Sequence, residues 1–157
     1  MKSSVYRKRF VIISLLSALI FNINAYAANK DCSKVTGKVA RAIVTTAIEN
    51  REPINRVLIA ENKLDKLYFF SDLRHMQGQQ VIHRWEYEGK VVLRKRFDVK
   101  GPRWRIYSSN KMSPAMTGRW TVMITDMHDC PIKAVVFQFV KQNPEGQGSA
   151  VIDLRNE

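Results

Sequence analysis

Six arginines at alternating positions of strand-like segments are the side chains of this sequence best suited to chemistry, and that chemistry is anion binding. They are Arg84, Arg94, Arg96, Arg103, Arg105 and Arg119. A guanidinium is a planar fork of N–H donors that matches the oxygens of phosphate or carboxylate in pairs. If their strands share one sheet, the six form one cationic surface for such a ligand. The alternative is that they divide between two sheets and pair with local acids such as Glu86 or Asp98.

Patterns typical of enzymes and metal sites are absent from the sequence. It contains no Gly-x-Ser-x-Gly, no His-Glu-x-x-His and no glycine-rich phosphate loop. His75, His83 and His128 lack the spacing of metal ligands, and Ser108 and Ser109 have no sequence-adjacent base. We therefore expect no catalytic residue, no metal and no cofactor.

The three tryptophans, Trp85, Trp104 and Trp120, could stack sugars or bases on an exposed surface. Alternation along each segment instead turns all three toward the interior, so we expect them to form the aromatic core of the domain. His83 shares the inward face of Trp85, and we expect it to be a hydrogen-bonded core histidine.

The elements that carry these side chains should be β-strands, because after the N-terminal segment no stretch keeps helical periodicity for three turns. Runs of β-branched and aromatic residues between turn residues predict strands at 39–48, 56–60, 67–73, 80–87, 91–99, 103–108, 119–126 and 134–140. This pattern predicts an all-β fold: an antiparallel, immunoglobulin-like β-sandwich of about seven or eight strands.

Alternation also predicts the register of the hairpin formed by residues 80–87 and 91–99. Inward positions have odd numbers in both segments, so Trp85 should pair with Leu93 and Tyr87 with Val91, across a three-residue loop at 88–90. The same register places Arg84 opposite Arg94, although like charges in this position destabilise a sheet slightly.

The N-terminal segment has the features of a cleaved secretory signal. Basic residues precede an apolar run at 10–21, and Ala25 and Ala27 supply small residues at the positions that a signal peptidase reads. The run is shorter than the roughly 20 residues of a membrane-spanning helix, so we expect no transmembrane span in the mature protein. The predicted organisation is a signal at 1–27, a β-sandwich domain at 28–140 and a flexible C-terminal tail at 141–157, with a periplasmic or secreted location.

Two cysteines lie beyond the predicted signal, and an exported protein meets an oxidising compartment. We therefore expect a disulfide between Cys32 and Cys130, with two free thiols or a metal site with His128 as the alternatives. Four of the 26 Lys and Arg residues and none of the 14 acidic residues lie in the signal, which leaves a net charge of +8. This excess either favours anionic partners or serves only solubility.

Three tryptophan-containing strings carry a resemblance to a known family: HRWEYEGKVV at 83–92, GPRWRIYSS at 101–109 and TGRWTVMITD at 117–126. With Arg-Glu-Pro near position 52 and YFFSDL at 68–73, they resemble the bacterial family catalogued as domain of unknown function 2914 over residues 39–140. The resemblance implies a compact β domain of bacterial envelope proteins. It implies no particular activity, so no catalytic residues are carried over, and the two cysteines are not part of the pattern.

These observations predict a non-catalytic periplasmic binding module. Its ligand would be an anionic glycan or lipid of the envelope, or an envelope protein, bound on an outer sheet face or an edge strand. The alternative is an envelope-assembly factor that binds a polypeptide by strand addition. A cell-wall hydrolase is a third possibility, and we do not expect nucleic acid as a partner.

Overall fold

The computed structural model describes residues 32, 35–142 and 149–154, so the predicted signal at 1–27 lies outside the described residues. Every regular element within the described ranges is a β-strand: β1 (Lys38–Thr45), β2 (Ile48–Glu49), β3 (Glu52–Pro53), β4 (Asn55–Glu61), β5 (Lys66–Arg74), β6 (Gln80–Tyr87), β7 (Lys90–Asp98), β8 (Arg103–Lys111), β9 (Gly118–Thr125), β10 (Pro131–Val140) and β11 (Ala150–Asp153). All eight predicted strands have a counterpart. None of the described residues forms a helix that could span a bilayer.

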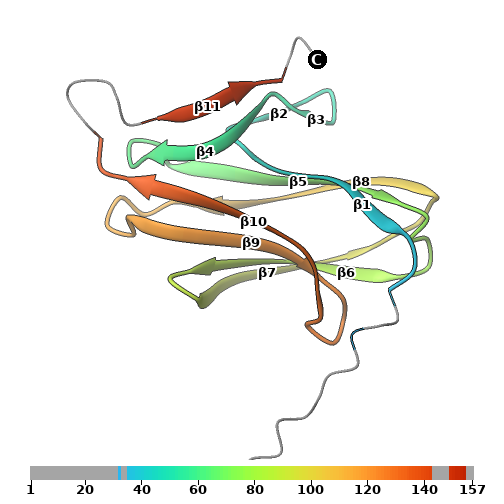
Figure 1. The fold of residues 1–157 in the computed structure, drawn as a ribbon. Helices are drawn as coiled ribbons and strands as arrows, with labels where there is room; N and C mark the ends of the chain where they lie inside the picture. Colours follow the sequence, from blue (N-terminus) through green and yellow to red (C-terminus); the bar gives the residue numbers. More distant parts are fainter. Residues whose placement is uncertain (1–31, 33–34, 143–148, 155–157) are drawn as a thin grey trace, which may run out of the picture.

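The strands form two sheets that pack face to face as a β-sandwich (Figure 1). The smaller sheet has the order β1-β5-β8, and the larger has the order β11-β4-β10-β9-β6-β7, with β11 and β7 at its edges. Strands β2 and β3 form a separate short hairpin. The predicted all-β sandwich is confirmed, and its immunoglobulin-like character stays a prediction.

One strand pair differs from the expected antiparallel arrangement. Strand β10 runs parallel to β4, with Gln138 opposite Ile59 and Phe139 opposite Ala60. The long chain between these strands passes through both sheets before it returns, which is the kind of connection that parallel neighbours require. The larger sheet is therefore mixed.

The core lies between the two sheets and is built around aromatic side chains. Trp85 and Trp120 are buried, and Phe137 contacts both of their rings. Trp104 is half-buried and packs against the same cluster. The inward positions predicted for the three tryptophans are thus confirmed.

The β6–β7 hairpin corrects the predicted loop. Trp85 pairs with Leu93 as expected, but Tyr87 pairs with Lys90, because the turn contains only Glu88 and Gly89. Both turn residues have positive φ angles of 47° and 77°, as a tight two-residue hairpin turn requires. The register shifts between Trp85 and Glu86 by a bulge on β7. Beyond the bulge, Leu93 and Phe97 are partly buried opposite Trp85 and Val81, while Val91, expected inside, is 46% exposed.

The C-terminal segment also differs from the expectation of a flexible tail at 141–157. Within it, β11 pairs antiparallel with β4, and Ile152 lies opposite Arg56. The β-branched residues Val151 and Ile152 suit an edge strand. The segment is too short for alternation to distinguish it from a loop, and it pairs with the edge of β4 that β10 leaves open.

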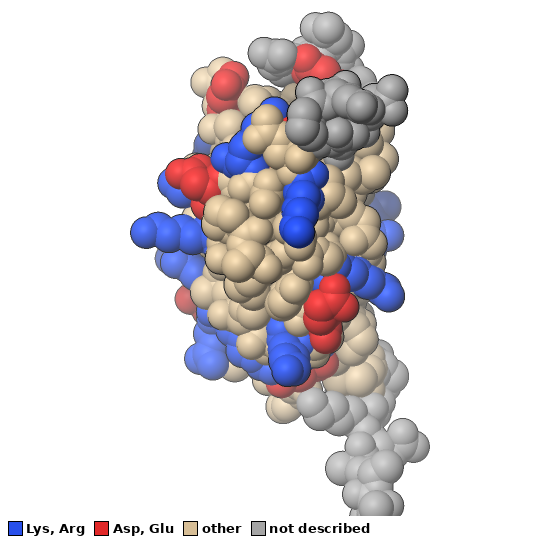
Figure 2. All heavy atoms as spheres, turned by 90° about the vertical axis from the view of Figure 1, so that its left-hand side faces the viewer, with Lys and Arg blue, Asp and Glu red and all other residues tan. Residues whose placement is uncertain are grey.

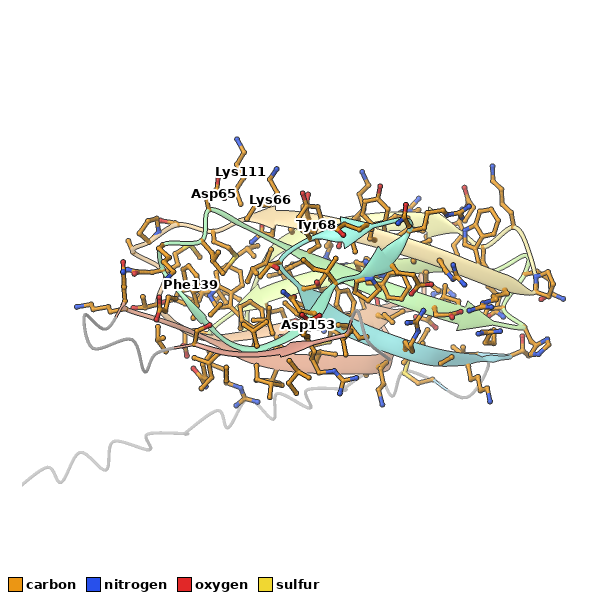
Figure 3. The ribbon with its side chains drawn as sticks, turned by 90° about the horizontal axis from the view of Figure 1, so that it is seen from above. Asp65, Lys66, Tyr68, Lys111, Phe139 and Asp153 are labelled. Atoms are coloured by element: carbon orange, nitrogen blue, oxygen red, sulfur yellow. A yellow bond between two sulfur atoms is a disulfide. The ribbon has the colours of Figure 1, made fainter. Side chains whose placement is uncertain are left out.

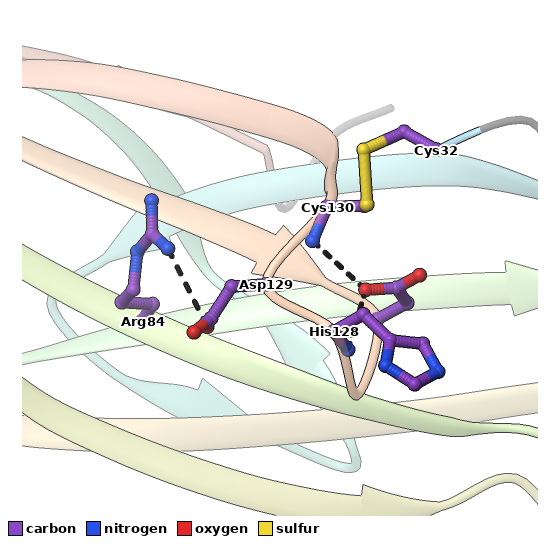
Figure 4. The surroundings of a disulfide bond; sticks show 6 residues. Cys32, Arg84, His128, Asp129 and Cys130 are labelled. Carbon is purple, nitrogen blue, oxygen red and sulfur yellow. Dashed lines mark hydrogen bonds and ion pairs between the residues drawn. A yellow bond between two sulfur atoms is a disulfide. The ribbon is translucent and has the colours of Figure 1, made fainter. Parts of the chain in front are cut away.

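A disulfide joins Cys32 to Cys130, as predicted (Figure 4). It attaches the N-terminal segment to the turn between β9 and β10. In that turn, the Asp126 carboxylate accepts hydrogen bonds from the backbone N–H groups of His128 and Cys130, both at 2.8 Å. A bridge between residues 98 apart restricts the unfolded chain and contributes about 4 to 5 kcal/mol in the simplest entropy model.

Candidate anion-binding site

The six arginines singled out from the sequence do not share one surface. Four of them lie on the larger sheet, on strands β6, β7 and β9: Arg84, Arg94, Arg96 and Arg119. Arg103 and Arg105 lie on β8 in the smaller sheet. When the left-hand side of Figure 1 faces the viewer, basic side chains accordingly project on both sides of the molecule (Figure 2). The division between two sheets is therefore the arrangement that the structure adopts.

On the larger sheet, Arg84 lies opposite Arg94, as the register predicted. Asp129 lies between these like charges, 2.6 Å from Arg94 Nη1 and 3.5 Å from Arg84 Nη1. The hydrogen bond to Asp129 raises the pKa of the Arg94 guanidinium, and Glu86 pairs with Arg84 Nε at 2.8 Å. The disulfide-bearing turn thus supplies a counterion, so Arg84 and Arg94 are already engaged.

The smaller sheet gathers a second set of arginines on its outer face. Across β1, β5 and β8, the register places Arg41, Asp72 and Arg105 in one row, with Arg74 and Arg103 in the next row of β5 and β8. The Asp72 side chain is only 1% exposed. Its carboxylate lies 2.9 Å from Arg74 Nε, 3.2 Å from an Arg103 nitrogen and 3.7 Å from an Arg41 nitrogen.

A second carboxylate reaches this group from the β2–β3 hairpin. Glu52 lies 2.5 Å from Arg41 Nη2 and 2.9 Å from Arg105 Nη1. We call the four guanidiniums with these two carboxylates the arginine cluster: Arg41, Arg74, Arg103, Arg105, Asp72 and Glu52. Four positive charges face two negative charges, so the cluster has a surplus of two positive charges.

A cleft of about 630 Å³ opens beside the arginine cluster. Arg41 and Arg103 line it together with Arg56 of β4, for which no ion pair occurs among the described residues. Its acidic lining residues are Glu49 and Glu52. Its apolar lining comes from Ile43, Pro53, Ile54 and Leu154. Three arginines beside a partly apolar wall can bind an anion through charge-assisted hydrogen bonds.

Local sequence could not identify this site, because it depends on strands that are far apart in the chain. Arg41, Arg56 and Arg74 were not selected as candidates, and neither were Asp72 and Glu52. The signal available was the alternation of residues 68–74, which places Asp72 and Arg74 on the outer face of their strand.

The core contains a polar network that sequence reasoning foresaw only in part. His83 is fully buried, and its two ring nitrogens contact the hydroxyls of Ser71 and Ser108, both at 3.0 Å. Trp85 Nε1 donates to the Ser108 hydroxyl at 3.0 Å. Burial lowers the pKa of His83 to about 3, so the imidazole is neutral at physiological pH. The prediction of a hydrogen-bonded core histidine is confirmed.

This Ser–His arrangement has the residue types of a nucleophile and a base, but its position assigns it to stability. Phe69 and Phe97 lie against the imidazole on β5 and β7, with ring centroids 4.6 and 4.8 Å away. A substrate could reach the hydroxyls only if the sheets separated. The other two histidines, His75 and His128, are exposed in turns, and the described residues contain no group of His, Cys, Asp and Glu that could hold a metal ion.

Residues 78–139 match a family described as "Protein of unknown function (DUF2914)". The matched range begins just before β6 and ends in β10, and it contains all three tryptophan strings. It confirms the resemblance to domain of unknown function 2914 over these residues, while residues 39–77 lie outside the match. No curated protein matches the chain.

Proposed function

We propose that this protein is a non-catalytic binding module of the bacterial envelope, which holds an anionic component in the cleft beside the arginine cluster. One observation supports this function above the others. Four guanidiniums surround only two carboxylates, and a cleft lined by Arg41, Arg56 and Arg103 opens at the same place. Guanidiniums without enough counterions attract phosphate or carboxylate groups.

The chemistry of the cleft favours a multiply charged ligand over a single monovalent ion. Arg41 contacts both cluster carboxylates, whereas Arg56 has no partner among the described residues. A second anionic group could therefore bind at Arg56 while the first binds near Arg103. We place the protein in the periplasm, with residues 1–27 removed on export, and the Cys32–Cys130 disulfide fits such an oxidising compartment.

The test compares two double variants with the same loss of charge. Arg56→Gln with Arg103→Gln removes two lining residues of the cleft, whereas Arg96→Gln with Arg119→Gln removes two exposed arginines of the larger sheet. Binding to vesicles that contain phosphatidylglycerol and to a polyuronate is measured at low and high salt. The cleft variant should lose about tenfold or more in affinity, since a hydrogen bond to a charged group contributes about 1.5 to 3 kcal/mol.

The control variant should keep its affinity within about twofold, because surface charges contribute little when they do not touch the ligand. Equal losses in both variants would mean that only the net charge attracts the anion, and the cleft would have no role. No loss in either variant would end the proposal.

A second candidate function, strand addition, is supported by the free edge of β7. This strand pairs only with β6, none of its nine residues is buried, and Lys90, Arg94, Lys95 and Arg96 make it strongly basic. Such an edge repels a second copy of itself and suits an acidic extended segment. The two double variants separate the functions, because Arg56→Gln with Arg103→Gln should weaken only binding in the cleft, whereas Arg96→Gln with Arg119→Gln should weaken an acidic strand paired with β7.

A further inference from the structure

The outer face of the smaller sheet continues beyond the arginine cluster as a strip of aromatic and polar side chains. Along β5 and β8, Phe70 lies opposite Tyr107, Tyr68 opposite Ser109, and Lys66 opposite Lys111. Side chains two apart on a strand share a face, so these rows lie on the same side as Asp72 and Arg105. We call Tyr68, Tyr107, Ser109, Lys66 and Lys111 the outer strip.

The tyrosines are the unusual members of the outer strip. Tyr107 is 50% exposed although it stands in the middle of a strand. Its ring meets the Tyr68 ring edge to face, with 6.5 Å between centroids. An exposed aromatic ring held in place by a neighbour is a ready stacking surface.

Charged groups border this aromatic surface on both sides. Arg105 is two residues from Tyr107 on β8, which is about 7 Å along the strand, and Lys111 is four residues away in the other direction, or about 13 Å. Lys66 lies over the Tyr68 ring at 5.9 Å from its centroid. Asp65, Lys66 and Lys111 project from the same side of the molecule as Tyr68 (Figure 3). Positive charges therefore lie on both sides of the aromatic surface, over a length greater than one ring of a chain-like ligand.

We infer that the ligand of the arginine cleft is an acidic glycan, with one sugar ring stacked on Tyr107 and its acidic groups bound by the arginine cluster and by Lys66 and Lys111. This inference depends on the proposed function, because it names the class of anion that the cleft receives. The ligand is a chain of rings that carry carboxylate or phosphate groups at intervals.

The polar groups of the strip favour a glycan over the other polyanions. Sugar rings carry hydroxyls that need both donors and acceptors, and the outer strip offers the hydroxyls of Tyr68 and Ser109, with the Asp65 carboxylate on the same side of the molecule as Tyr68. A lipid surface needs apolar side chains that insert among its tails, and the exposed large side chain here is a tyrosine. A single-stranded nucleic acid, whose bases can also stack on an aromatic ring, is distinguished from a glycan by direct comparison of the two affinities.

The experiment measures the affinity of the whole protein for a short polyuronate and for polyglutamate, which has carboxylates but no rings. Tyr107→Ala should weaken polyuronate binding about tenfold, the order expected when an aromatic stacking partner is removed, and should leave polyglutamate binding unchanged. Tyr107→Phe restores the ring and should recover most of the affinity. Val136→Ala, at a residue on the larger sheet that is also exposed, is the matched control and should have no effect.

The outcomes distinguish this inference from the proposed function. If Tyr107→Ala leaves polyuronate binding intact while Arg56→Gln with Arg103→Gln abolishes it, the glycan inference is wrong and anion binding stands. If neither variant weakens the binding, both proposals are wrong. Tighter binding of phosphatidylglycerol vesicles or of a single-stranded oligonucleotide than of polyuronate would also overturn the glycan inference.

Discussion

Strands β5 and β8 carry a neutral polar network on their inner face and a charged one on their outer face. Toward the core, Ser71 and Ser108 enclose the neutral His83. Toward solvent, the next residue of β5, Asp72, is surrounded by arginines that include Arg103 of β8. The inner network is neutral and its hydrogen bonds are paired, whereas the outer one has more positive than negative charge.

The difference fits a separation of stability from the proposed binding on one pair of strands. A buried polar group is tolerated when its hydrogen bonds are satisfied and it carries no charge. Charges are tolerated at the boundary with solvent, where a ligand can also reach them. Changes to the inner network should therefore alter stability, and changes to the arginine cluster should alter binding with smaller effects on stability.

The largest expected effect concerns acid stability and the inner network. The folded protein keeps His83 neutral down to a pKa of about 3, whereas an exposed histidine titrates at 6.5. Between these values the unfolded chain binds a proton that the folded protein does not, so this contribution to stability is present above pH 6.5 and is lost as the pH falls toward 3. The difference between the two pKa values corresponds to about 5 kcal/mol in the free energy of unfolding.

Urea unfolding between neutral pH and pH 4 measures this slope. The control is His83→Gln, which keeps one donor and one acceptor but does not titrate. It should be less stable at neutral pH and should lose less stability as the pH falls. Parallel pH profiles for the two proteins would contradict a neutral buried His83.

The second effect concerns the carboxylate at the centre of the arginine cluster. Asp72→Asn leaves Arg41, Arg74 and Arg103 close together with one negative charge fewer. We expect a loss of about 2 kcal/mol at neutral pH, below the range for fully buried ion pairs because the arginines are partly exposed. Thermal unfolding at low and high salt measures it, and added salt should recover part of the loss by screening the arginines. A loss that does not respond to salt would mean that Asp72 acts through packing alone.

The third effect is a gain of affinity. Glu52 occupies donors of Arg41 and Arg105 that an anionic ligand could use, and its hairpin is closed by Asn50 and Arg51 with positive φ angles. Glu52→Gln removes the competing charge and should raise polyuronate affinity about threefold to tenfold, with less than about 1 kcal/mol change in stability. Glu86→Gln, which removes the partner of Arg84 on the larger sheet, is the matched control. Unchanged affinity in Glu52→Gln would mean that the ligand does not use Arg41 or Arg105.

More of the fold than of the site could be predicted from the sequence, for a physical reason. Alternation is local, so the inward positions of Trp85, Trp104 and Trp120 and the pairing of Arg84 with Arg94 follow from neighbouring residues. The bulge in β7 and the strand β11 depend on a turn geometry and on an open edge that no short pattern encodes.

The site depends on which strands become neighbours. The chain crosses from the larger sheet to the smaller one between β7 and β8, and this crossing separates Arg94 and Arg96 from Arg103 and Arg105. Arg41 reaches Asp72 only because β1 pairs with β5, about 30 residues later in the chain. Spacing along the sequence cannot reveal either event.

The smallest expected effect tests whether the outer faces of the two sheets differ at all. Arg84→Gln with Arg94→Gln removes two charges from the larger sheet, where Asp129 and Glu86 already occupy both guanidiniums. Polyuronate affinity should stay within about twofold, because guanidiniums already paired with nearby acids contribute little to a distant site. The comparison is Arg56→Gln with Arg103→Gln, which has the same change in net charge at the cleft. If the two double variants lose affinity equally, the ligand responds to the total charge of the protein, and the distinction between a paired face and a binding face would have to be abandoned.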